Sequence, residues 1–158
     1  MNYIVFISFL LDGIITNFIR ISSNVFIPLF TLTSLVIIFP YYHKEKEYFK
    51  MCILFGFLYD IVFCNTLFIN IGLFIMVGFV TKTLNYYLSN NILNNTIMLI
   101  INIILYRISF YFILFLANIF KFDFMLLFKS IYSSFFINIL YSFILYFILE
   151  KVMLKKRY

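Results

Sequence analysis

The stretch LFGFLYDIVFCNTLFINIGLF, Leu54 to Phe74, decides the fold class of this chain. It is almost entirely apolar, and its one charged residue, Asp60, lies near its middle. A carboxylate at the centre of a membrane-spanning helix costs about 2.5–3.5 kcal/mol on insertion scales. Such a residue is retained where it faces protein and has a partner, so we take Asp60 as a candidate site residue.

The composition of the whole chain points to lipid as its solvent. Of its 158 residues, 65% are hydrophobic and 11% are charged, whereas soluble domains have about 25% charged residues. We therefore predict an all-α integral membrane protein with a single transmembrane domain over residues 1–158. The net charge of +6 does not indicate nucleic acid, because the basic residues flank apolar segments.

A spanning helix needs about 20 mostly apolar residues, and six segments approach this length. The first has no basic region and no cleavage pattern, so we expect an uncleaved span. The third and fourth are joined by a tight exit, Cys64-Asn65-Thr66, and the alternative there is a broken or re-entrant element buried in protein. The predicted spans are residues 3–19, 25–42, 48–64, 66–88, 96–120 and 130–149.

The Lys and Arg residues predict the orientation of the spans. With six spans, eight basic residues fall on the side of the two termini and three fall on the other side. Both termini are therefore expected in the cytoplasm of a multi-pass protein of the bacterial cytoplasmic membrane. The eight are Lys44, Lys46, Lys50, Lys82, Lys151, Lys155, Lys156 and Arg157, and the three are Arg20, Lys121 and Lys129.

Apart from Lys50 and Lys82, which we assign to the cytoplasmic side, three charged residues fall inside predicted spans: Asp12, Asp60 and Arg107. Their depths are similar, so one guanidinium with five donors can serve both carboxylates in a shared polar cluster. Interhelical packing is the simplest role of such a cluster. The alternatives are a binding surface for another membrane protein, a cavity floor, or a proton or ion relay.

The chain offers little for chemistry. We find no nucleophile with a matching base, so we predict no catalytic residue and no enzyme. Two cysteines and one histidine do not supply the four ligands that a zinc site needs, so no metal or cofactor is expected.

The quoted stretch resembles part of a known protein family. The segment FGFLYD, followed by NTL and a further Asn, resembles the most recognisable block of the rod shape-determining protein MreD family. Asp12, in a Leu-Leu-Asp context, is similar to an acidic position in the first span of that family. The residues that carry the resemblance are Phe55, Gly56, Phe57, Leu58, Tyr59, Asp60, Asn65, Thr66, Leu67 and Asn70.

The resemblance implies a non-enzymatic scaffold of the bacterial elongasome. Such proteins bind MreC, a bitopic protein, and through it connect MreB filaments with RodA and a class B penicillin-binding protein during lateral peptidoglycan synthesis. The family fold resembles the substrate-binding subunits of energy-coupling-factor vitamin transporters, and such a subunit is the alternative function. A transporter subunit should show a polar cavity and small residues, often Ala, for coupling to ATPases, but this chain has one Ala, Ala117.

One position departs from the family pattern. Many members have Leu-Gly after the Asn-Thr of the turn, whereas this chain has Leu67-Phe68. A Gly would permit a tight backbone turn, so we expect a different geometry after Asp60, with Gly72 taking over part of that role. We also hypothesise that Asp60 holds the third span and its exit in the shape that MreC recognises.

Overall fold

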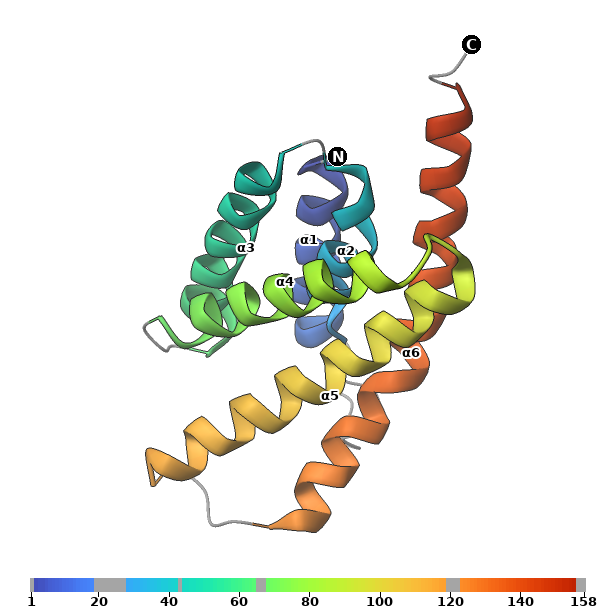
Figure 1. The fold of residues 1–158 in the computed structure, drawn as a ribbon. Helices are drawn as coiled ribbons and strands as arrows, with labels where there is room; N and C mark the ends of the chain where they lie inside the picture. The colour runs from blue at the N-terminus through green and yellow to red at the C-terminus, as the bar shows by residue number, and fades with distance from the viewer. Residues whose placement is uncertain (1, 19–27, 43, 65–67, 119–122, 156–158) are drawn as a thin grey trace.

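The computed structural model describes residues 2–18, 28–42, 44–64, 68–118 and 123–155. Within these ranges the chain is helical and has no strand, which confirms the predicted all-α class. The helices in Figure 1 are α1 (Asn2–Phe18), α2 (Phe30–Ile38), the 3₁₀ turn η1 (Phe39–Tyr41), α3 (Glu45–Tyr59), the π-helical turn η2 (Asp60–Cys64), α4 (Ile69–Tyr87), α5 (Ile92–Leu116) and α6 (Phe124–Lys155).

Among the described residues, three helices are long and apolar enough to cross a membrane. They are α4, α5 and the part of α6 from Leu127 to Lys151. Two further apolar segments, Asn2–Thr16 and Phe30–Tyr41, are shorter. The membrane character read from the composition is therefore supported by helix length as well.

Helix α2 forms the centre of the protein. All nine of its residues are buried, and it packs against α1, α4, α5 and α6. This corrects the predicted span 25–42, because the helix covers only Phe30–Ile38, about 14 Å at 1.5 Å per residue. Pro40 explains the early end, since its missing N–H cannot bond to the carbonyl four residues earlier. Residues 25–27 lie outside the described ranges.

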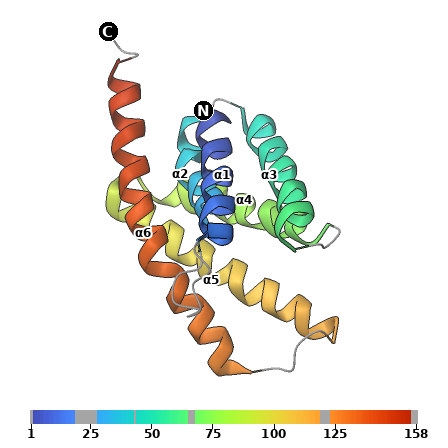
Figure 2. The ribbon, with the colours of Figure 1, turned by 180° about the vertical axis from the view of Figure 1, so that it is seen from behind.

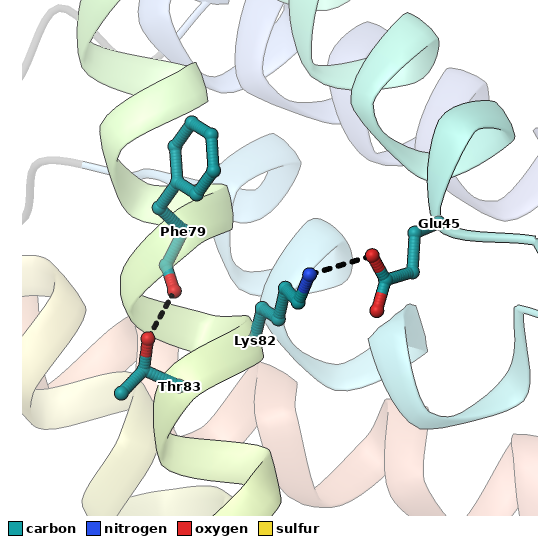
Figure 3. Close-up of polar contacts among 4 residues, drawn as sticks. All are labelled: Glu45, Phe79, Lys82 and Thr83. Atoms are coloured by element: carbon teal, nitrogen blue, oxygen red, sulfur yellow. Dashed lines mark hydrogen bonds and ion pairs between the residues drawn. The ribbon is translucent and has the colours of Figure 1, made fainter.

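The closest helix packing joins α3 and α4, with α4 running across α3 and α2 (Figure 1). A Cβ atom on Gly56 of α3 would lie 2.6 Å from the Ile71 Cα and 2.9 Å from the Asn70 carbonyl oxygen. Only glycine permits this backbone approach. At the far end of the same interface, Lys82 Nζ donates to Glu45 Oε2 at 2.6 Å (Figure 3).

Helices α5 and α6 form a long hairpin. Helix α6 has 32 residues, far more than the predicted segment 130–149. The end of α5 and the start of α6 extend away from α1–α3 (Figure 2), and between them lies a cavity of about 720 Å³ lined by apolar and aromatic side chains. Helix α1 begins and α6 ends at the same end of the molecule (Figures 1 and 2).

Candidate functional site

Asp12, on α1, lies at the first turn of α2. Its side chain is 1% exposed, and both carboxylate oxygens accept hydrogen bonds from backbone N–H groups. The Phe30 N–H donates to Oδ1 at 2.8 Å, and the Thr31 N–H donates to Oδ2 at 2.9 Å. The carboxylate therefore serves as the cap of a helix that begins 18 residues later in the chain.

The sequence at the start of α2 explains why this helix needs a distant cap. The residue before the helix, Leu29, has no side-chain acceptor for the first N–H groups, which no helix can satisfy internally. A negative charge at a helix N-terminus also interacts favourably with the helix dipole. Asp12 supplies both the acceptors and the charge.

Two hydroxyl groups complete the surroundings of Asp12. The Thr31 hydroxyl donates to Oδ2 at 2.7 Å, and the Tyr59 hydroxyl donates to the same oxygen at 2.6 Å. With the two backbone donors, four hydrogen bonds offset the loss of water around this buried carboxylate. Because Tyr59 is on α3, Asp12 joins three helices: α1, α2 and α3.

Asp60 does for α4 what Asp12 does for α2. It is 1% exposed, and the Asn70 N–H donates to its two oxygens at 3.0 and 3.1 Å. The Ile71 N–H donates to Oδ2 at 3.3 Å, and the Asn70 side-chain amide donates to Oδ1 at 3.0 Å. The side-chain oxygen of Asn70, Oδ1, accepts from the Tyr106 hydroxyl at 2.7 Å, which extends the network to α5.

The backbone just before α4 is strained at Phe68. This residue has φ 67° and ψ 0°, the left-handed region that favours glycine, and its side chain is 67% exposed. A backbone conformation that favours Gly is therefore adopted here by Phe, and the expected difference from the family's turn stays a prediction. Gly72 does not take over this role, since a Cβ there would meet nothing within 4 Å.

Arg107 reaches α6. Its Nε donates to the Ser134 hydroxyl at 3.0 Å, which ties α5 to α6. The hydrogen bonds described above for both carboxylates come from helix N-termini and neighbouring side chains, and the sharing of Arg107 by both carboxylates stays a prediction.

The family-like residues divide between the interior and the surface. Phe55, Tyr59, Asp60 and Asn70 are buried, and Gly56 makes the close helix contact described above. Phe57 is exposed and Leu58 is partly buried. Asn65, Thr66 and Leu67 lie outside the described residues.

Sequence reasoning missed three polar partners. Thr31 and Tyr106 take part in the two networks above, and Asn138 Oδ1 accepts from the Leu29 N–H at 2.9 Å. Asn138 also accepts from the Thr33 hydroxyl at 3.3 Å. Each is a polar residue within an apolar segment, which is the signal that marks candidates for buried hydrogen bonding.

The arrangement positions helices. Each carboxylate accepts hydrogen bonds from the start of one helix and ties it to another part of the fold, so the geometry supports a structural role for both. No family model, curated protein or solved structure matches this chain. A function for the site therefore has to be argued from the geometry and from the family-like stretch.

Proposed function

We propose that this protein is a non-enzymatic scaffold of bacterial wall elongation, similar to MreD, that binds an MreC-like bitopic membrane protein. Through that partner it acts on MreB, RodA and a class B penicillin-binding protein, and so on lateral peptidoglycan synthesis and rod shape. The observation that carries the proposal is the cap that Asp60 provides at the start of α4. Asp60 lies inside the family-like stretch, and its hydrogen bonds hold the start of α4 next to Phe68, whose backbone is strained.

The surface beside Asp60 suits a partner in the membrane. Ile61 is 51% exposed, Val62 is 55% exposed, and Phe68 is 67% exposed. We call these three residues the α3–α4 tip. Ile61 and Val62 directly follow Asp60, and Phe68 directly precedes the helix whose Asn70 and Ile71 N–H groups bond to it, so this carboxylate ties the two parts of the tip together.

We place all six helices, α1 to α6, in the bacterial cytoplasmic membrane, with both termini in the cytoplasm. The supporting observations are the excess of basic residues on the side of the termini and the position of the first and last helix ends at one end of the molecule (Figure 1). In this orientation the α3–α4 tip faces the extracytoplasmic side, where a bitopic MreC-like protein carries its large domain.

The test uses two substitutions at Asp60 and measures co-purification with MreC. Asp60→Asn keeps one oxygen acceptor and an uncharged cap, whereas Asp60→Leu leaves the Asn70 and Ile71 N–H groups without their acceptor. We expect Asn to retain partner binding and Leu to lose most of it. Equal expression and equal MreC recovery for Leu and wild type contradict the proposal.

A second pair of variants separates folding from recognition. Val62→Ser changes the α3–α4 tip, and Leu93→Ser changes a residue of α5 that is 75% exposed and lies away from the tip. Both should leave the thermal stability in detergent nearly unchanged, because both side chains are on the surface. Only Val62→Ser should reduce MreC recovery, and an equal reduction by Leu93→Ser argues against the tip.

The alternative is a substrate-binding subunit of an energy-coupling-factor vitamin transporter. The cavities of about 720 and 430 Å³ beside α5 have almost entirely apolar linings, whereas a vitamin site needs several placed polar groups. Recovery of two ATPases and a coupling membrane subunit with the tagged protein, without an MreC-like protein, replaces the scaffold proposal with the transporter.

A further inference from the structure

The cavity of about 720 Å³ between the end of α5 and the start of α6 lies apart from the two carboxylate networks. The two helices diverge there and extend away from α1–α3 (Figure 2). Ten side chains line the cavity, and all of them are aliphatic or aromatic. Two of these side chains, Phe128 and Tyr132, are 65% and 80% exposed, so the cavity opens onto the surface of the protein.

Polar contacts join the two helices at both ends of this cavity. Toward the centre of the protein, Arg107 Nε of α5 donates to the Ser134 hydroxyl of α6 at 3.0 Å. Toward the loop, the Tyr111 hydroxyl accepts from the Asp123 N–H at 2.8 Å and donates to the Asp123 carbonyl oxygen at 3.1 Å. Because the helices are joined on both sides of the gap, the space between them is a defined feature of the fold.

The lining does not suit water or a polar ligand. A buried water needs two to four polar partners, and a site for a polar small molecule has several placed polar groups. The lining side chains offer only the hydroxyl groups of Tyr111 and Tyr132, and that of Tyr111 is bonded to Asp123. If the cavity were empty, its walls would lose their packing contacts, so the lining favours an apolar chain as the occupant.

The size of the cavity suits a lipid chain better than a protein helix. Along α6 the lining extends from Phe124 to Phe135, about 18 Å at 1.5 Å per residue. A volume of about 720 Å³ over this length gives a mean cross-section of roughly 40 Å². An α-helix with its side chains is about 10–12 Å across, a cross-section of roughly 80–110 Å², whereas an extended acyl chain is one CH₂ group wide. A partner helix therefore does not fit between α5 and α6, and an acyl chain does.

An exposed lysine on α6 provides a positive charge beside this cavity. Lys129 directly follows the lining residue Phe128. Lys151, also exposed, lies 22 residues further along the same helix, a distance of about 33 Å that matches a hydrocarbon core of about 30 Å. The two lysines therefore lie at the headgroup levels of opposite leaflets, where an ammonium group meets lipid phosphates.

We propose that the cavity binds an acyl chain of an anionic phospholipid, with the lipid phosphate next to Lys129. The chain packs between Ile104 of α5 and Ile131 of α6. Tyr111 and Tyr132 lie nearer the headgroups, where tyrosine is enriched in membrane proteins. The lipid belongs to the leaflet opposite the two termini. This inference rests on the membrane placement proposed above and is independent of the identity of the protein partner.

The first experiment compares two tryptophan variants, Phe135→Trp and Phe136→Trp. The chain has no Trp, so each variant contains a single tryptophan fluorophore. Phe135 lines the cavity, whereas Phe136 is 64% exposed and outside the lining, at a depth that differs by no more than about 1.5 Å. Each variant is placed in phosphatidylcholine vesicles that contain increasing fractions of phosphatidylglycerol brominated on its acyl chains, and quenching of the fluorescence is measured.

A bound lipid predicts different quenching curves for the two variants. The Phe135→Trp variant should be half-quenched at an about five-fold lower fraction of brominated lipid than the Phe136→Trp variant. Equal curves indicate ordinary contact with the bilayer and overturn the proposal. Weaker quenching of Phe135→Trp than of Phe136→Trp means that protein, such as a second copy of this chain, covers the cavity, and this also overturns the proposal.

The phosphate contact is tested with Lys129→Gln, for which Lys151→Gln is the matched control. Both residues are exposed lysines of α6, but only Lys129 lies beside the cavity. In the Phe135→Trp background, Lys129→Gln should raise the half-quenching fraction about five-fold, and Lys151→Gln should leave it unchanged. An unchanged value for Lys129→Gln, or an equal rise for both variants, overturns the phosphate contact.

A measurement on the wild-type protein covers the case in which Phe135→Trp fails to fold. The delipidated protein in detergent is titrated with phosphatidylglycerol or phosphatidylcholine, and the bound lipids are counted by native mass spectrometry. The first phosphatidylglycerol should bind about five-fold more tightly than the first phosphatidylcholine. Equal affinities, or a series of phosphatidylglycerol molecules that bind equally weakly from the first onward, contradict a specific lipid site.

Discussion

The first turns of α2 and α4 differ from the α5–α6 hairpin in the way their side chains are buried. At the two helix starts, each carboxylate oxygen meets particular N–H and hydroxyl groups at 2.6–3.3 Å. In the outer part of the hairpin, large apolar side chains such as Phe128 and Tyr132 are exposed and line a mostly apolar cavity.

The two regions differ in how many residue types each of their positions tolerates. A buried carboxylate is tolerated only if nearly every bond to it is made, so few residues can replace it. An apolar side chain that faces lipid is stabilised to about the same degree by any neighbour of similar size. We therefore expect mutations to have large effects at the capped helix starts and small effects on the outer hairpin.

The largest effect is expected for Asp12→Leu. The change removes the acceptor of four hydrogen bonds, among them the Phe30 and Thr31 N–H groups. Each buried donor left unsatisfied costs about 1–3 kcal/mol, so the free energy of unfolding should fall by more than about 4 kcal/mol. Denaturant titration followed by circular dichroism measures the loss.

Asp12→Asn is the control for that prediction. It keeps one carbonyl oxygen and a similar shape, so it should retain a measurable part of the stability that Leu loses. If the Leu variant unfolds at the same denaturant concentration as the wild type, the cap does not contribute to the free energy of unfolding. The contrast between the two regions then fails.

The next largest effect is expected for Gly56→Ala. The new Cβ would lie 2.6 Å from the Ile71 Cα, and a backbone neighbour cannot move as a side chain does. We expect a loss of about 2–3 kcal/mol. Gly72→Ala, with open space around its Cβ, should instead stabilise α4 by about 0.5–1 kcal/mol, and the same loss at both sites argues against close packing at Gly56.

A smaller effect, of the opposite sign, is expected for Phe68→Gly. Phe68 has φ 67°, which costs an L-residue about 1–2 kcal/mol relative to glycine. Because the side chain is mostly exposed, little packing is lost. The free energy of unfolding of the variant, measured by thermal melting, should therefore rise by about 1 kcal/mol. Phe68→Ala keeps the strain and should show no gain, so a gain with Ala as large as with Gly contradicts this explanation.

The smallest effects are expected on the outer hairpin. Phe128→Leu and Tyr132→Phe replace exposed residues of the cavity lining with other apolar side chains. Each should change the free energy of unfolding by no more than about 0.5 kcal/mol. A loss comparable to that of Gly56→Ala in either variant indicates that this surface is packed more specifically than we infer.

The sequence was a good guide to the helices and a poor guide to their lengths. The apolar segments predicted the six α-helices of the described residues, but α2 ends early at Ile38, just before the turn with Pro40, and α6 continues well beyond the predicted segment. Helix ends depend on capping partners and packing that lie elsewhere in the chain. Hydrophobicity alone therefore could not place them.

The sequence by itself determined the all-helical, lipid-compatible class of the protein and identified Asp12 and Asp60 as buried charges that need partners. These properties follow from composition and from the cost of burying charge, which do not depend on how the helices are arranged. The tertiary structure decided that the partners are the N–H groups of α2 and α4. A hydrogen bond between residues far apart in the chain requires particular distances, and only the packing of the helices sets those distances.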